Sequence, residues 1–216
     1  MIISGLTMTL GNLVALQQNN PIRLLAYSSI SQAGFILAPI AISGITGDYQ
    51  DGIFASVTYL IIYAFMNIGA FLSVHLFSNF TNSDNFYEWG GIAKHSPLAG
   101  VLTTVFFFSL AGIPPLGGWF AKFVVFRSLL STGEIVGISL AIVGAINAVI
   151  ALVYYARISK VIWMDELKNP EEERTFEFQN PLKVVGAFTV LITFVAGIFP
   201  GIFSYLGEVS SIFFGN

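Results

Sequence analysis

Long apolar stretches fill most of the chain, and short polar breaks separate them. The six longest stretches without a charged residue are 1–22, 24–47, 52–83, 96–121, 135–156 and 184–207. A helix needs roughly 20 consecutive apolar residues to cross a bilayer core about 30 Å thick. The pattern therefore predicts six membrane-spanning helices, at about residues 2–17, 22–43, 52–78, 98–130, 134–163 and 182–206.

The fourth predicted helix, residues 98–130, is too long to cross the membrane as one straight span. Its length corresponds to about 50 Å at the rise of an α-helix. The stretch AGIPPLGGWFAK within it contains prolines, which lack a backbone donor, and glycines, which permit non-helical dihedrals. These break residues are Gly112, Pro114, Pro115, Gly117 and Gly118. We expect a helix broken at residues 112–118, a feature typical of transporter sites.

Composition supports a membrane protein. Hydrophobic residues make up 55% of the 216-residue chain and charged residues only 10%, whereas a soluble domain carries about 25% charged residues. The expected fold class is an all-α polytopic membrane protein, with residues 1–216 forming a single membrane domain. The chain has no cysteine and 2 histidines, which excludes disulfides, thiolate metal sites and three-histidine sites, so we expect no bound metal.

The distribution of cations predicts the orientation. Most of them fall on one side of a six-span chain: Arg23, Lys94, Arg157, Lys160, Lys168, Arg174 and Lys183. Cytoplasmic connections carry the excess of lysine and arginine. The connections 18–23, 79–97 and 157–183, including the loop 164–181, should therefore be cytoplasmic, with both termini on the opposite face. We expect a multi-pass protein of a bacterial plasma membrane.

Lys122 is the leading candidate for chemistry because it lies inside an apolar span. A lysine at the centre of a membrane helix costs about 2.5 to 3.5 kcal/mol on insertion scales and usually marks function. The alternative is that its side chain extends to the interface, but Leu130 at the predicted helix end is about 12 Å away along the axis. A lysine removed from water loses its proton more readily, which suits a proton relay.

Polar side chains on neighbouring helices are candidates for a proton path to this lysine. Tyr59, Tyr63 and Asn67 recur every four residues and so share one face of the third helix. Gln32 lies in the polar and small stretch AYSSISQAG of the second helix. Such groups order water, but they also hold membrane helices together, which is their commoner use.

Two further candidates lie near the ends of predicted helices. His75 has a side chain suited to proton exchange near neutral pH, although an imidazole wetted at the interface is an equally good interpretation. Arg23 precedes the AYSSI stretch, where it either admits protons from the cytoplasm or anchors the helix at the interface.

Other chemistries lack their motifs. GGWFAK does not end in the GK[ST] of a phosphate loop. Paired carboxylates, a nucleophile triad, a dinucleotide fingerprint and a basic nucleic-acid patch are also missing from the sequence. We therefore expect no redox chemistry on this chain and no nucleic-acid partner.

Three sequence blocks resemble the antiporter-like subunits of respiratory complex I, most closely the subunit N (subunit 2) group. They are GNLVALQQNNPIRLLAYSSISQAGFIL at 11–37, SLAGIPPLGGWFAKFVVF at 109–126 and VYYARISKVIW at 153–163. The resemblance implies that the chain corresponds to the C-terminal half of the family protein. It also identifies Lys122 with the lysine of the family's second broken helix, and Arg23 with the arginine before its AYSSI block.

The chain departs from the family pattern at three positions. Ile22 replaces a lysine, Gln32 replaces a common histidine, and Asn67 stands at about the place of a lysine found in larger family members. The last two changes argue against a wire of histidine and lysine and favour a hydrated path that ends at Lys122.

The resemblance implies a proton-translocating membrane subunit of NADH:quinone oxidoreductase, a translocase of the respiratory chain. Quinone reduction elsewhere in the complex would change the field along a row of buried charges, and Lys122 would take up or release a proton in response. Its partners would be neighbouring antiporter-like and small membrane subunits and the lipid bilayer. NADH, FMN, iron–sulfur clusters and quinone would be bound by other subunits, and this chain would bind no cofactor.

Two alternatives remain open. The chain could be the ion-translocating subunit of a related cation/proton antiporter or membrane-bound hydrogenase. It could also be a purely structural membrane subunit. Copurifying proteins separate the first alternative from complex I, and proton flux after neutralising Lys122 separates a transporter from a structural subunit.

Overall fold

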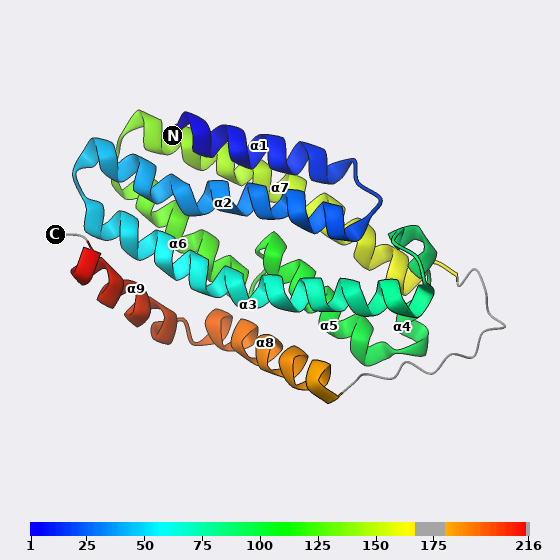
Figure 1. Cartoon of the computed structure of the whole chain (residues 1–216). Coiled ribbons are helices and arrows are strands. Elements are labelled where there is room, and N and C mark those ends of the chain that lie inside the picture. Colours follow the sequence, from blue (N-terminus) through cyan, green and yellow to red (C-terminus); the bar gives the residue numbers. More distant parts are fainter. Residues whose placement is uncertain (167–179, 215–216) are drawn as a thin grey trace.

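The computed structural model describes residues 1–166 and 180–214, which form helices joined by short connections, with no strand among them. Figure 1 labels the elements along the chain. They are α1 (Ile2–Leu16), α2 (Pro21–Thr46), α3 (Tyr49–Thr81), the 3-10 turn η1 (Phe86–Trp89), α4 (Ile92–His95), α5 (Pro97–Ala111), α6 (Gly117–Ser131), α7 (Ile135–Met164), α8 (Asn180–Ile198) and α9 (Gly201–Phe214).

Residues suited to helix termini define both ends of α2 and the start of α3. Asn20 accepts a hydrogen bond from the backbone N–H of Arg23 at the start of α2, as an N-cap residue does. Gly47 ends α2 in the left-handed conformation, at φ 78°. Asp48 follows at once and caps α3 by accepting from the backbone N–H of Asp51. Helices α2 and α3 are therefore antiparallel neighbours.

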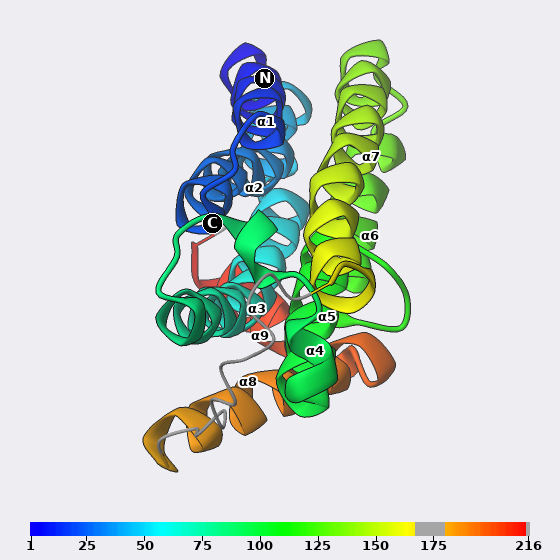
Figure 2. The ribbon, with the colours of Figure 1, turned by 90° about the vertical axis from the view of Figure 1, so that its right-hand side faces the viewer.

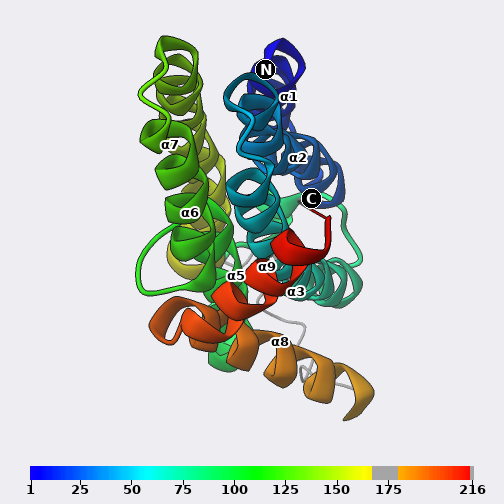
Figure 3. The same cartoon turned by 90° about the vertical axis from the view of Figure 1, so that its left-hand side faces the viewer.

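The helices form a bundle around a buried centre. Seen end-on, α1 and α2 lie on one side and α6 and α7 on the other, with α3 and α5 between their lower parts (Figure 2). Helices α8 and α9 lie along the outer side of α3, which both of them contact (Figure 3). The interior is thus enclosed by helices from both ends of the chain.

The connections gather at two ends of the bundle. Figure 1 places the N-terminus, the α2–α3 turn and the α6–α7 turn at one end, where α9 also finishes. The α1–α2 turn, α4 and the end of α7 lie at the other end. This grouping agrees with the alternation expected of a six-span chain.

Small residues allow α1 and α2 to pack closely. A methyl group added at Gly34 would lie 2.8 Å from the backbone nitrogen of Met8, and one added at Gly11 would lie 2.9 Å from the carbonyl oxygen of Tyr27. Ser4 donates to the carbonyl of Gly34 across the same interface, at 2.7 Å. Close backbone approach through small residues is the usual way that membrane helices associate.

The helices account for most of the predicted spans. Helices α2, α3 and α7 are each long and apolar enough to cross a membrane, and α1 and α5 are shorter apolar helices. The predicted helix is broken, since α5 ends at Ala111 and α6 begins at Gly117. The break is shorter than the expected 112–118, because Gly117 and Gly118 already form the first turn of α6. The predicted connection 79–97 also contains two short helical turns, η1 and α4, and the part of the loop at 167–179 lies outside the described residues.

The single helix expected at 182–206 is wrong. Helix α8 ends at Ile198 and α9 begins at Gly201, with their axes bent by 84°. Pro200 has no backbone N–H with which to continue the helical hydrogen bonds, and its ring clashes with the preceding turn. The chain therefore turns sharply at this point.

Candidate functional site

The break between α5 and α6 is a tight turn that holds the end of α5 against the start of α6. Gly112 has φ 96°, and its backbone N–H donates to the carbonyls of Phe108 and Ser109 at 3.0 and 2.9 Å. Ser109 then accepts from the backbone N–H of Gly118, at 3.1 Å. The end of α5 is thereby tied to the first turn of α6.

Lys122 lies on the second turn of α6 and points back to the end of α5. Its Nζ donates to the carbonyl oxygens of Leu110 and Ala111, at 3.1 and 2.6 Å. The side chain is only 5% exposed, and Nζ lies 5.3 Å from the centre of the Phe35 ring. The last carbonyls of a helix lack partners within it and carry the negative end of its dipole, so they stabilise the ammonium.

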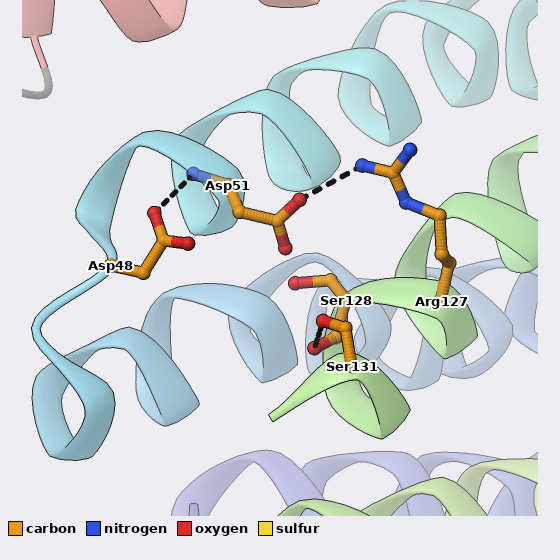
Figure 4. A network of polar contacts seen from close by, with 5 residues as sticks. All are labelled: Asp48, Asp51, Arg127, Ser128 and Ser131. Carbon is orange, nitrogen blue, oxygen red and sulfur yellow. Dashed lines mark hydrogen bonds and ion pairs between the residues drawn. The ribbon is translucent and has the colours of Figure 1, made fainter. Parts of the chain in front are cut away.

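No carboxylate neutralises Lys122 among the described residues. The described residues contain an ion pair elsewhere, between Arg127 of α6 and Asp51 of α3, at 2.9 Å. This pair lies near the end of the bundle that holds the α2–α3 turn (Figure 4). In the same view, the backbone N–H of Asp51 donates to the carboxylate of Asp48. This pair is partly exposed and such pairs contribute little to stability.

Gln32 of α2 joins the lysine site. Its Nε2 donates to the Leu110 carbonyl at 3.2 Å, the same oxygen that Lys122 contacts. Its Oε1 accepts from the hydroxyl of Tyr59 on α3, and the Tyr59 ring stacks on that of Phe35. Gln32 and Tyr59 are both buried. One carbonyl thus links the lysine to side chains from α2 and α3.

Tyr63 and Asn67 follow Tyr59 on successive turns of α3. The Tyr63 hydroxyl is buried near Ser29 but has no hydrogen-bond partner among the described residues. Asn67 is half-buried. The polar face that the sequence predicts on this helix therefore starts at the lysine site and continues along α3.

His75 and Arg23 lie outside this cluster. His75 is exposed and its Nε2 lies 3.0 Å from the Asn79 amide. About 24 Å of helix separates it from Tyr59. The Arg23 side chain is exposed at the start of α2. Both residues belong to the end of the bundle where the predicted cytoplasmic connections lie (Figure 1).

A second buried polar network lies beside the first. The Tyr154 hydroxyl of α7 donates to Oδ1 of Asn12 on α1 at 2.9 Å and shares a hydrogen bond of 3.1 Å with the Ser28 hydroxyl of α2. Ser28 and Tyr155 share a further hydrogen bond of 2.6 Å, and Asn12 donates to Asn147. Ser28 is one turn from Gln32, so the network begins next to the lysine site. The sequence gives little sign of it, because its members are distant from one another along the chain.

The described residues contain no cluster of three or more histidine or acidic side chains that could hold a metal ion. The groups at the break are one amine, amides, hydroxyls and backbone carbonyls. These groups can hold and exchange protons and order water.

Comparisons with known proteins agree with this arrangement. Residues 1–150 match a family model described as "NADH:quinone oxidoreductase/Mrp antiporter, TM". The chain is 42% identical over 212 residues to NADH-quinone oxidoreductase subunit N 2 of Rhizobium meliloti. That match includes 97% of this chain but 42% of the relative, so the chain spans about two fifths of its length.

Solved structures share the fold. A chain of the Mrp complex from Dietzia sp. superposes with a TM-score of 0.82 at 21% identity, covering 97% of this chain and 46% of that one. A chain of respiratory complex I from Thermus thermophilus gives 0.68 at 23% identity, covering 94% and 43%.

Proposed function

Because the chain belongs to the NADH:quinone oxidoreductase/Mrp antiporter membrane family, we propose that it translocates protons through a path that ends at Lys122. The observation that carries this proposal is the buried ammonium held only by neutral groups among the described residues. A buried charge of this kind is costly and marks function in membrane proteins. The relative in Rhizobium meliloti is named as a subunit of NADH-quinone oxidoreductase, and we propose the same complex for this chain.

The chemistry at the site is the gain and loss of one proton. The ammonium of Lys122 releases a proton to water and becomes a neutral amine, and it takes up a proton in the reverse step. The carbonyls of Leu110 and Ala111 stabilise the charged form. A change in charge on a neighbouring subunit would shift this balance without any redox step on this chain. NADH, FMN, iron–sulfur clusters and quinone belong in our proposal to other subunits.

The path to the lysine follows the polar groups next to it. Gln32 donates to the Leu110 carbonyl that Lys122 also contacts, and Tyr59 donates to Gln32. Tyr63 and Asn67 continue along α3. Water between these groups would complete the route, since a buried hydroxyl such as that of Tyr63 calls for a hydrogen-bond partner. His75 and Arg23, at the end of the bundle, are the proposed entry groups.

Replacing the lysine tests the proposal. In the assembled complex, reconstituted in vesicles, Lys122→Ala should lower the number of protons pumped per electron several-fold because it removes the exchangeable proton. Lys122→Arg should restore part of the function, since arginine keeps the charge but hardly loses it. Lys160→Ala serves as the matched control, because Lys160 is exposed on α7.

Assembly must be checked for each variant, since a lost subunit would also abolish pumping. If the assembled Lys122→Ala complex pumps at the wild-type ratio and rate, the relay role is wrong and the chain is better explained as a structural subunit.

The likeness to the Mrp complex supports a second candidate, an ion-translocating subunit of a cation/proton antiporter. Purification of the tagged chain from its native membrane separates the two. Recovery with NADH-oxidising subunits supports the oxidoreductase, and recovery with antiporter or hydrogenase subunits supports the related complex.

A further inference from the structure

The two sharp bends of the chain meet each other. Helix α8 reaches the break between α5 and α6 in its last turn, just before the chain bends by 84° into α9. A methyl group added at Gly197 of α8 would lie 2.6 Å from the carbonyl carbon of Leu116 and closer still to the carbonyl oxygen of Pro115. No side chain fits between α8 and the break at this point.

Neighbouring contacts hold the same two segments together. The indole N–H of Trp119 on α6 donates to the Gly197 carbonyl at 3.3 Å. A methyl group added at Gly117 would lie 3.0 Å from Cβ of Ala196 and 3.1 Å from the carbonyl oxygen of Thr193. We call the contact made by Pro115, Leu116, Gly117 and Trp119 with the last turn of α8 the break–α8 seam.

The first residues of the break, next to the end of α5, contact Lys122. A methyl group added at Gly112 would lie 2.8 Å from Cδ of Lys122, and the Ala111 carbonyl accepts from its Nζ. The connection from Gly112 to Leu116 therefore contacts Lys122 at its first residue and Gly197 at its last two residues. A displacement of this short connection at Gly197 must also displace the residues that contact Lys122, because close-packed interiors transmit displacement.

We propose that Gly197 is a positioning residue for Lys122: the close approach of α8 at Gly197 sets where the break places the carbonyls that hold the ammonium. This inference rests on the proposed function of Lys122. Trp119 has a weaker part in the same seam, since it contributes one hydrogen bond at its edge. Helix α8 thus acts on the lysine through the break.

The groups that face Lys122 define what such a displacement changes. They are the Leu110 and Ala111 carbonyls from α5, Gln32 and Phe35 from α2, and Tyr59 of α3 behind Gln32. None of these groups carries a charge. From α8, the Thr193 carbonyl lies near Gly117, and the Thr193 hydroxyl is bonded to the Thr189 carbonyl. Moving the carbonyls therefore alters the environment of a single titrating cation.

The test compares two glycines of α8. Gly197→Ala pushes a methyl group into the break, whereas Gly186→Ala makes an ordinary contact of 3.6 Å with Leu72, and both changes alter helix propensity equally. In the assembled complex, Gly197→Ala should displace the pH profile of proton pumping by about one unit, the effect of weakening one hydrogen bond to a charged group. Gly186→Ala should leave the profile in place, and Trp119→Phe should displace it by less.

The outcomes separate this inference from the proposed function. A pH profile that stays in place in assembled Gly197→Ala, with pumping still sensitive to Lys122→Ala, overturns the positioning role alone. Normal pumping in Lys122→Ala overturns the proposed function. If Gly197→Ala does not assemble, Trp119→Phe decides, because it keeps an aromatic ring next to Phe120 and Phe123 but removes the indole N–H together with the second ring. A profile unmoved in Trp119→Phe then overturns the inference.

Discussion

At the scale of single residues, the partner of Lys122 is a helix end instead of an acidic side chain. The Leu110 and Ala111 carbonyls cannot take up or lose a proton, so within the described cluster the charge changes only when Lys122 itself does. The sequence predicted a buried lysine next to a break, but not its partners. Every residue has a backbone carbonyl, so the sequence does not distinguish those that bind Lys122. Their direction depends on how the chain turns at Gly112, where α5 ends.

Gly112→Ala should impair proton pumping beyond its effect on stability. The residue has φ 96°, which costs a side-chain-bearing residue about 1 to 2 kcal/mol, and the added methyl group would also press on Lys122. Gly133→Ala is the control, because Gly133 has φ 66° but nothing within 4 Å of its added methyl group. Thermal unfolding in detergent should show a similar loss for both, whereas vesicle assays should show lost pumping only for Gly112→Ala. Equal pumping in the two variants would contradict this.

At the scale of elements, the apolar pattern predicted where helices run better than how they meet. The broken helix could be predicted because Pro114 and Pro115 lie between glycines in the middle of a span that is too long for one straight helix. The angle of 84° between α8 and α9 could not be predicted, since it depends on the packing of both helices against α3. The network around Tyr154 could not be predicted from the sequence, because α1, α2 and α7 each contribute isolated polar residues to it.

Tyr154→Phe should destabilise the packing of α1, α2 and α7. The change removes the hydroxyl that is hydrogen-bonded to both Asn12 and Ser28, and leaving buried polar groups unsatisfied costs about 1 to 3 kcal/mol. Tyr205→Phe is the control, since Tyr205 is 64% exposed on α9. The melting temperature in detergent should fall for Tyr154→Phe and remain unchanged for Tyr205→Phe. Equal melting temperatures would show that the network does not stabilise the bundle.

At the scale of the whole molecule, one flank of the bundle is apolar and uncovered. On α1, the side chains of Ile2, Leu6 and Leu10 are more than half exposed, and Ile142 and Val149 of α7 are exposed as well. Such a surface requires hydrocarbon or further protein around it. Since the chain spans about two fifths of the relatives' length, both lipid and additional helices of a longer protein are suitable neighbours.

The orientation in the membrane can be measured because the chain contains no cysteine, so a single introduced cysteine gives an unambiguous label. Asp84 lies between α3 and η1, at the end of the bundle with the predicted cytoplasmic connections, and Glu134 lies at the α6–α7 turn at the opposite end (Figure 1). Both side chains are exposed.

The excess of lysine and arginine in the connections predicts that the Asp84 end faces the cytoplasm. A maleimide that cannot cross the membrane should therefore label Glu134→Cys in intact cells of a bacterial host, after removal of any outer barrier. It should label Asp84→Cys only after the plasma membrane has been opened. Both variants must assemble and retain pumping, so that the label reports the native topology. Labelling of Asp84→Cys in intact cells, with Glu134→Cys protected, would reverse the orientation and place the proposed entry groups His75 and Arg23 on the outer face.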